Sequence, residues 1–530
     1  MGKPHKESQD SNTEHSGIAG WSGSLSGAGL AGKSRWWRLL RTFLIISGPG
    51  LIVMMADNDV GAVNTYTQAG ALYGYGLLWT LVILIPVLGV NQEMAARLGA
   101  ITGVGHARLI FARFGRFWGA FSFIDLFILN FLTLLTEFIG VVQAANYFGI
   151  SKYLAVPAFF VFLTTMVVTG SYRIWERWMM ALVAAMFIFL PLAFLVPHPA
   201  GALARGLFIP QSPGGLNSGT LLLIIAIVGT TVAPWQLFFQ QSNVVDKRIG
   251  PAHLRYEQTE TWIGSVLTSL FAGFMMLIGV ALYNAHLGWD NAEVAAHALD
   301  HLFRAQAGGW FAVGLLVAAL LGAMATTMSS AWALGDVLRI HHSLHRKVRE
   351  APIFYAAILS QFGLAALLVL TPKLPVNLII TGVQALAGIL LPSATVFLVL
   401  LCNDPEVLGP WTNSRGVNAT AVLIVGVLLG LSLILTVTTL FPQWNGILVS
   451  EVVFGVLGLA LPPGAWLWAR MPPAPQPDRL IREHWRMRPL GELRAPLASR
   501  LRTTGLVTLR VYLVLAVLAV GFKIWQLAQL

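Results

Sequence analysis

The chain has 530 residues, of which 56% are hydrophobic and only 11% charged, and its mean hydropathy is +0.71. A soluble protein carries about 25% charged residues, so this composition excludes a soluble domain and indicates a polytopic membrane protein. The net charge is +11, and the basic residues lie between apolar segments. We expect them there to set the membrane topology and to contact anionic lipid rather than nucleic acid. The single cysteine, Cys402, excludes an internal disulfide and a cysteine-based metal cluster.

Thirteen membrane spans are expected, because a helix needs about 20 mostly apolar residues to cross a bilayer. They are expected near 41–70, 76–99, 118–148, 153–172, 178–197, 219–243, 260–284, 309–337, 353–371, 376–402, 419–441, 447–469 and 508–528. The expected parts are a disordered cytoplasmic tail (1–36), a core (37–403) of two five-helix units (about 41–197 and 219–402), helices 11 and 12 (404–469), a basic cytoplasmic linker (470–506) and an additional C-terminal transmembrane helix (507–530).

Basic residues set the orientation of these spans. When the segment "KSRWWRLLR" is placed in the cytoplasm, clusters of Arg and Lys recur in every second loop, and the intervening loops hold few. Cytoplasmic loops carry an excess of Lys and Arg, and one missed span would scramble the alternation from that point. We therefore expect a multi-pass protein of the plasma or inner membrane with a cytoplasmic N-terminus.

Two of the spans are interrupted in the same way. The first contains "GPGLIVMMADNDVG" and the sixth contains "VGTTVAPWQ", so each combines Gly or Pro with polar residues near mid-membrane. The breaks lie five helices apart, in equivalent places of the two units. This pattern indicates an all-α inverted-repeat transporter in which two discontinuous helices line a central site. Unwound backbone is tolerated at that depth only where it is buried or lines a cavity.

The residues at the two breaks suit a hard divalent cation. Carboxylates, amide oxygens and backbone carbonyls are the ligands that Mg²⁺, Ca²⁺ and Mn²⁺ prefer, and a charged residue at membrane depth is a functional hypothesis by default. The alternative for Asp59 is a structural N-cap, and for either aspartate a buried salt bridge. The candidate ligands are Asp57, Asn58 and Asp59 at the first break, and Thr230, Thr231, the carbonyls around Ala233, and the Gln236 amide at the second.

Four segments carry a resemblance to a known family. "GPG…DVGA…TQAGALYGYGLLW", "TEFIGVVQAANYFGI", "GTTVAPWQLFFQQSNVV" and "TGVQALAGILLPSATVFLVLLCND" resemble helices 1, 3, 6 and 10 of the Nramp family of divalent-metal transporters, in matching order over about residues 44–403. The resemblance implies a LeuT-type 5+5 inverted repeat of 12–13 transmembrane helices, with the metal between helices 1 and 6. It places Asp59 on the family's metal-binding aspartate and Gln384 on a glutamine that helps bind the metal.

The departures from the family pattern bear on ion choice and coupling. Ala62 occupies the place of a liganding asparagine, Thr230 that of a liganding alanine carbonyl, and Ala233 that of the methionine whose thioether favours softer ions. Trp235 replaces a histidine, which puts proton coupling by the family's usual route in doubt, although Glu137 matches an acidic residue of that route. These changes resemble those of the Nramp-related magnesium transporters and favour a hard cation such as Mg²⁺, with Mn²⁺ as a further candidate.

Several alternatives stay open. Within the same class, the chain could be a proton-coupled Mn²⁺ or Fe²⁺ importer. From other classes, it could be an organic-solute symporter of the same fold or a non-transporting membrane sensor. Arg173 and Glu176 form an inner-end charge cluster that suits topology or gating. Enzyme signatures are missing, so we expect a transporter that needs no cofactor. The metal ion (Mg²⁺, Mn²⁺ or Fe²⁺) is then its substrate. We expect it to work as a monomer or a weak oligomer.

Overall fold

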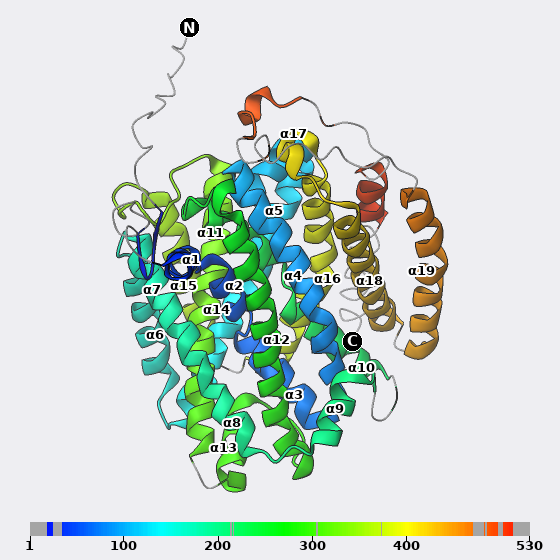
Figure 1. The fold of residues 1–530 in the computed structure, drawn as a ribbon. Coiled ribbons are helices and arrows are strands. Elements are labelled where there is room, and N and C mark those ends of the chain that lie inside the picture. Colours follow the sequence, from blue (N-terminus) through cyan, green and yellow to red (C-terminus); the bar gives the residue numbers. More distant parts are fainter. Residues whose placement is uncertain are drawn as a thin grey trace.

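The computed structural model describes residues 18–24, 34–211, 215, 217–303, 306–372, 374–441, 443–469, 482, 485–494, 496 and 502–511. Apart from one hairpin, the regular structure in these ranges is helical, and the helices pack as a long bundle (Figure 1). The expected all-α polytopic fold is confirmed.

The helices fall into two successive units with peripheral additions. The first unit contains α1 (Arg35–Ile46), α2 (Pro49–Ala56), α3 (Val60–Tyr73), α4 (Leu78–Thr102), α5 (His106–Tyr147), α6 (Lys152–Val167), α7 (Tyr172–Ala185), η2 (Met186–Ile188) and α8 (Phe189–Leu195). The second contains α10 (Ser218–Thr231), α11 (Pro234–Asp246), η3 (Pro251–His253), α12 (Leu254–Asn284), α14 (Ala307–Leu338), α15 (Pro352–Val369) and α16 (Val376–Cys402). The additions are α9 (Ala200–Phe208), α13 (Ala292–Phe303), α17 (Pro405–Leu408), η4 (Gly409–Trp411), α18 (Arg415–Leu440), α19 (Gly446–Ala469) and η5 (Leu490–Glu492).

Within the described ranges, nine helices are long and apolar enough to cross a membrane, or ten if the pair α1–α2, bent by 52°, counts as one span. Two shorter apolar helices, α6 and residues Gly446–Leu459, complete the series. Each of the first twelve expected spans therefore coincides with a helix. The thirteenth, 508–528, lies outside the described residues except for 508–511, which belong to a helix over 502–511.

The two breaks have local chemical causes. Helix α2 ends at Ala56 and α3 begins at Val60, where the Asp59 side chain caps the new helix by accepting a hydrogen bond from the Ala62 N–H. Helix α10 ends at Thr231 and α11 begins at Pro234, which lacks the N–H that would continue the helix but suits the first position of a new one. An additional bend lies between α1 and α2 at Gly48, whose φ of 153° favours glycine.

The packing of the two units supports a repeat. Helix α3, which begins the first unit after its break, packs on α12 of the second, and α11, after the break of the second unit, packs on α4 of the first. The third membrane spans of the two units, α5 and α14, pack against each other along the centre of the bundle (Figure 1). This exchange places both breaks beside the central pair α5 and α14.

The N-terminal segment differs from expectation. Residues 18–24, inside the expected disordered tail 1–36, form a hairpin of β1 (Ala19–Gly20) and β2 (Gly23–Ser24) that contacts α1 and α7, and α1 already begins at Arg35. The Ser22 hydroxyl donates to the Leu44 carbonyl at 2.8 Å. The end of a helix leaves carbonyls without intrahelical backbone donors, so the hairpin adds a donor to the Leu44 carbonyl, which also accepts from the Ser47 hydroxyl at 3.3 Å.

Candidate metal site at the two helix breaks

The first break is buried in the centre of the bundle. Asp57, Asn58 and Asp59 are 1%, 0% and 3% exposed. Asp59 Oδ1 accepts the Ala62 N–H at 2.8 Å, so the N-cap role is present. A cap occupies one carboxylate oxygen and leaves the charge of the group in place, so it is compatible with binding a cation. Both side-chain atoms of the Asn58 amide are buried without a hydrogen-bond partner.

Asp57 is held by the second break. Its Oδ1 accepts a hydrogen bond from Gln236 Nε2, while its Oδ2 is buried without a partner. The Gln236 oxygen in turn accepts from Gln92 Nε2 on α4 at 2.9 Å. The Gln236 amide oxygen, expected from the sequence as a ligand, is therefore engaged here, and Gln236 positions Asp57. Gln92 is a positioning residue that the sequence analysis missed.

The two threonines of α10 differ in what they can offer. The Thr231 hydroxyl donates to the Ile227 carbonyl at 2.6 Å and lies 2.7 Å from the Tyr66 hydroxyl, so it is engaged. Thr230 Oγ1 is buried without a partner. Ala233 is 4% exposed and lies at the break itself, in extended backbone before Pro234. Thr230 and the backbone of the break thus remain as oxygen donors.

Helix α16 brings Gln384 to the start of α3. A Cβ at position 61 would overlap the Gln384 amide nitrogen and would lie 3.2 Å from Asp59 Oδ1, so this amide and this carboxylate both lie against Gly61. Gln384 Nε2 is buried without a partner. The bare glycine at position 61 is what leaves room for the Gln384 amide beside Asp59.

This arrangement predicts a selective effect of Gly61→Ala. The added methyl group would push the end of a flexible side chain, and glycine to alanine in a helix is otherwise favourable by about 1 kcal/mol, so we expect unfolding stability to change little. Metal affinity should fall about as far as in Gln384→Ala, because both changes remove the same amide. Isothermal titration and thermal unfolding of both variants check this. A full loss of affinity in Gln384→Ala but none in Gly61→Ala would contradict it.

A third carboxylate lies beside Asp59. Glu137 on α5 accepts the Val60 N–H through Oε2 at 3.2 Å, while its Oε1 is buried without a partner. A Cβ at Gly322 of α14 would lie 2.7 Å from both Asp59 Cβ and Glu137 Cδ, so the central helix pair encloses the two acids. The three acids Asp57, Asp59 and Glu137 are each at most 3% exposed.

No ion pair in the described part of the chain neutralises these acids. The ion pairs found there join Arg97 to Glu93, Arg113 to Asp404, Lys247 to Glu176 and His342 to Asp336. The salt-bridge alternative for the aspartates therefore has no support within the described ranges. Nor do three His, Cys, Asp or Glu side chains converge there on one point that could hold a metal. A bound cation would need amide, hydroxyl or backbone oxygens as well.

An aromatic cluster continues from the second break. Trp235 lies on the first turn of α11, and its carbonyl accepts from Ser329 Oγ of α14 at 3.0 Å. The ring centroids of Trp235 and Phe239 lie 6.2 Å apart, those of Phe239 and Trp332 5.4 Å, and those of Trp332 and Trp175 6.2 Å. These four side chains, from α11, α14 and α7, are at most 1% exposed. They fill the space on one side of the breaks.

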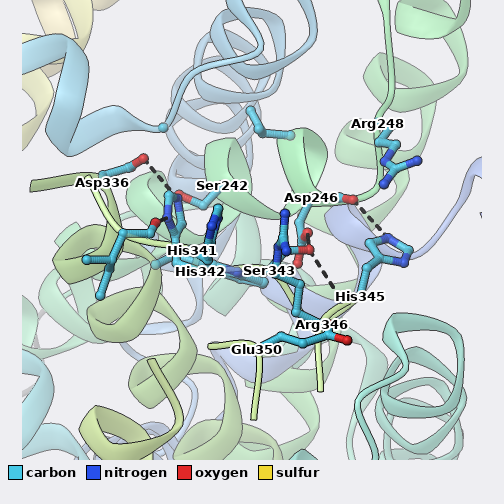
Figure 2. A pocket seen from close by; sticks show the side chains of 14 residues that line it. Ser242, Asp246, Arg248, Asp336, His341, His342, Ser343, His345, Arg346 and Glu350 are labelled. Atoms are coloured by element: carbon cyan, nitrogen blue, oxygen red, sulfur yellow. Dashed lines mark hydrogen bonds and ion pairs between the residues drawn. The ribbon is translucent and has the colours of Figure 1, made fainter. Parts of the chain in front are cut away.

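Trp332 also lines a cavity of about 520 Å³ at the ends of α11 and α14 (Figure 2). His342 Nε2 lies 3.2 Å from Asp336 Oδ1, whereas His345 Nε2 lies 3.2 Å from the Asp246 carbonyl. The two histidines thus serve different partners and form no joint metal site. Burial lowers the pKa of His342, but the hydrogen bond and charge of Asp336 outweigh it, so the pKa is raised.

The bend between α1 and α2 is fixed by buried charges. Lys247 Nζ donates to the Ile46 and Ser47 carbonyls at 2.5 and 2.9 Å and to Glu176 at 2.6 Å, and both charged side chains are fully buried. Glu260 Oε1 accepts the N–H groups of Gly48 and Leu51 at 2.5 and 2.8 Å.

Of the charged pair expected on α7, Glu176 therefore has a defined role at the bend. Arg173 is partly exposed, and its Nε is buried without a partner. From the sequence, Lys247 is one of the basic residues that mark a cytoplasmic loop, and no further role is expected of it. The free carbonyls that a helix leaves before a "SGPG" break are a signal that a buried donor is needed there.

Known proteins resemble this chain in both sequence and fold. The family model described as natural resistance-associated macrophage protein-like matches residues 50–438. Two curated relatives named divalent metal cation transporter MntH, from Granulibacter bethesdensis and Xanthomonas campestris pv. campestris, are each 27% identical, covering 77% and 75% of this chain and 91% and 90% of theirs. The crystal structure of the Eremococcus coleocola manganese transporter with an aromatic bis-isothiourea compound aligns at a TM-score of 0.59 and 21% identity, covering 82% of this chain and 96% of that one.

Proposed function

Because the chain belongs to the Nramp family, we propose that it is a secondary transporter that carries divalent metal cations across the membrane. The observation that supports this most is the set of three buried carboxylates, Asp57, Asp59 and Glu137, which no described basic side chain pairs. Buried charges are paired or coordinate metals, and a doubly positive ion would offset two of the three.

We propose Asp59, Asp57 and Asn58 as ligands from the first break. Thr230, the carbonyls around Ala233 and the Gln384 amide would complete the set. Gln236 and Thr231 support the site through their hydrogen bonds. For Asp57, Asn58 and Thr230 the assignment follows from side-chain oxygens that are buried without a protein partner, and for Gln236 and Thr231 from the hydrogen bonds that already engage their oxygens. Gln384 would have to bind through its amide oxygen, and its place and that of Asp59 rest on the family resemblance.

For the transported ion we propose a hard cation, Mg²⁺, with Mn²⁺ as a second substrate. The proposal rests on alanine at position 233, which offers a carbonyl but no soft thioether. A doubly charged ion gains about 4.6 kcal/mol per 100 mV from the membrane potential, so inward movement needs no coupled proton. The second candidate is a proton-coupled manganese importer, since the solved structure from Eremococcus coleocola is titled a manganese transporter.

Flux into proteoliposomes separates these two candidates. We expect the wild-type protein to carry Mg²⁺ down a negative internal potential without acidifying the lumen. The measurement uses a magnesium indicator and a pH indicator inside the same vesicles, with Mn²⁺ in a parallel series. Uptake of Mn²⁺ but not Mg²⁺, with acidification, would support the manganese importer instead.

A substitution at position 233 tests the ion preference separately. We expect Ala233→Met to raise the Mn²⁺ to Mg²⁺ uptake ratio by about tenfold, which corresponds to about 1.4 kcal/mol, because a thioether prefers the softer ion. Ala233→Leu is the matched control, since it adds similar volume without sulfur. If leucine shifts the ratio as much as methionine, the effect is one of cavity size and the argument from ligand softness is wrong.

For orientation we propose that the N-terminus is cytoplasmic and that the face bearing α17, at the top of Figure 1, is the cytoplasmic face. The alternation of basic loops supports this. The 520 Å³ cavity of Figure 2 lies at the C-terminal ends of α11 and α14 and so opens on the same side. Movement of α1 and α2 about the bend at Gly48 would then alternate access to the site.

A further inference from the structure

Four charged side chains are buried together at the bend between α1 and α2. Glu257 and Glu260 lie three residues apart on α12, Glu176 comes from α7 and Lys247 from the end of α11, and each is at most 2% exposed. Lys247 pairs with Glu176 at 2.6 Å, and among the described residues no ion pair joins a cation to Glu257 or Glu260. The cluster therefore contains three carboxyl groups and one cation.

The two carboxyl groups of α12 need a proton between them. They lie within hydrogen-bonding reach of each other, as residues three apart on one helix face do. Two ionised carboxylates at that distance repel each other and have no hydrogen to share, so one of the two holds a proton. Each group also has an Oε2 that is buried without a donor from the described protein. The bent state of α1 and α2 therefore binds one proton in this pair.

The hydrogen bonds on the pair decide which group is ionised. Glu260 Oε1 accepts two backbone N–H groups at the start of α2, from Gly48 at 2.5 Å and from Leu51 at 2.8 Å. Glu257 Oε1 accepts one, from the Gln240 amide at 2.8 Å, and the oxygen of this fully buried amide has no partner. The N–H groups at a helix start favour a negative charge. The charge therefore lies on Glu260 and the shared proton on Glu257.

Other charged and titratable groups lie on the helices packed against this end of α12. They are Asp246 and Lys247 at the end of α11, Tyr172 and Glu176 on α7, Glu93 and Arg97 on α4, and Arg38 and Arg41 on α1. Arg97 is bound to Glu93 at 3.1 Å, and Arg38 is exposed. Lys247 is the cation close enough to attract both carboxyl groups of the pair. Because its own ion pair is with Glu176, the charge of Glu260 depends on the two N–H groups of α2.

We propose that Glu260 is a proton-binding site that couples the position of the bend between α1 and α2 to the pH of the cytoplasm. The proposal rests on the movement of α1 and α2 about Gly48 given under the proposed function. When the bend moves, the Gly48 and Leu51 N–H groups leave Glu260, and a buried carboxylate without donors is favoured as the neutral acid. A proton from the cytoplasmic solvent then binds a Glu260 oxygen and returns to the same side when the bend closes.

This cycle gives a defined response to pH without carrying protons across the membrane. The moved state binds one proton more than the bent state, so a lower cytoplasmic pH favours the moved state. For one proton, the ratio of moved to bent molecules rises by at most about tenfold for each unit that the pH falls. Because the proton enters and leaves on one side, the response is compatible with metal uptake that does not acidify the lumen.

Double electron–electron resonance on the full-length protein in lipid nanodiscs, without metal, tests the site. Spin labels are placed on Leu39→Cys of α1 and Trp178→Cys of α7, since these positions are 46% and 45% exposed, whereas Cys402 is buried. The pH is lowered from about 8 to 5. We expect the ratio of the two distance populations in the wild-type background to change by close to tenfold per pH unit over part of this range.

Three variants in the labelled background identify the titrating group. Glu260→Gln keeps an oxygen for the Gly48 and Leu51 N–H groups but cannot be ionised, so its ratio should change less than about twofold over the whole range. Glu257→Gln resembles the protonated acid and should keep the response. Glu93→Gln is the matched control, because Glu93 is a largely buried acid on neighbouring α4 that does not contact the bend, and it should keep the response as well.

Mg²⁺ added at fixed pH is the control for movement itself. If Mg²⁺ shifts the distances but pH does not, the proton site is disproved and the proposed transport function stands. If neither shifts them, the movement of α1 and α2 is disproved and the proton site with it. A response that persists in Glu260→Gln, or is lost in Glu93→Gln, would also overturn the assignment to Glu260. The wild-type titration decides the proposal even if a variant does not fold.

Discussion

Metal uptake is expected to fall more than a hundredfold when Asp59 is replaced by asparagine, while the fold survives. Asparagine is as good an N-cap as aspartate, so the bond to the Ala62 N–H is kept and only the charge is lost. Removing one partner of a buried charge pair costs about 3–5 kcal/mol, and each 1.4 kcal/mol is tenfold in affinity. The measurement is Mg²⁺ and Mn²⁺ flux in proteoliposomes alongside thermal unfolding.

Asp59→Ala separates the two roles of this residue. It removes both the charge and the cap, so it should show the same loss of flux and, in addition, about 1 kcal/mol lower stability. Undiminished flux in Asp59→Asn would show that Asp59 is only a cap, and the proposed metal site would then have to be abandoned.

Replacing Lys247 by methionine is expected to cost about 3–5 kcal/mol of stability. The change leaves the fully buried Glu176 without its cation and the Ile46 and Ser47 carbonyls without a donor. Chemical denaturation in detergent measures the loss. Hydrogen exchange should rise first in α1 and α2, because these helices meet at the bend that Lys247 holds.

The double variant Lys247→Met/Glu176→Leu is the control for this prediction. Apolar replacement of both partners of a buried pair is often neutral, so most of the stability should return, and the remaining loss should reflect the two carbonyls. If the double variant loses as much as the sum of the two single variants, the pair does not act as a unit.

The two helix breaks, which the sequence predicted correctly, have a local cause. Gly48, Asp59 and Pro234 interrupt helices through their own backbone or side-chain chemistry, so both breaks could be located without a structure. The hairpin at 18–24 was missed because its Ser and Gly residues carry no periodic signal, and its donor is needed only by a neighbouring helix.

The parts that the sequence could not give depend on which helices meet. Gln236 carries a suitable ligand atom, but its oxygen is engaged by Gln92, which lies 144 residues earlier in the chain. The positive-inside pattern does not distinguish a buried lysine from an exposed one, and the Lys247 side chain is fully buried. Only the packing of α4 on α11 and of α7 on α2 assigns these two residues their roles.

The four-ring cluster of Trp175, Trp235, Phe239 and Trp332 has an energetic consequence for turnover. Parting these helices would wet roughly 200 Å² of ring surface, a penalty of about 5 kcal/mol. A doubly charged cargo falling through 100 mV releases about 4.6 kcal/mol. Under the orientation and the potential-driven uptake proposed above, these two energies are similar in size, so we expect uptake to slow steeply when the membrane is depolarised.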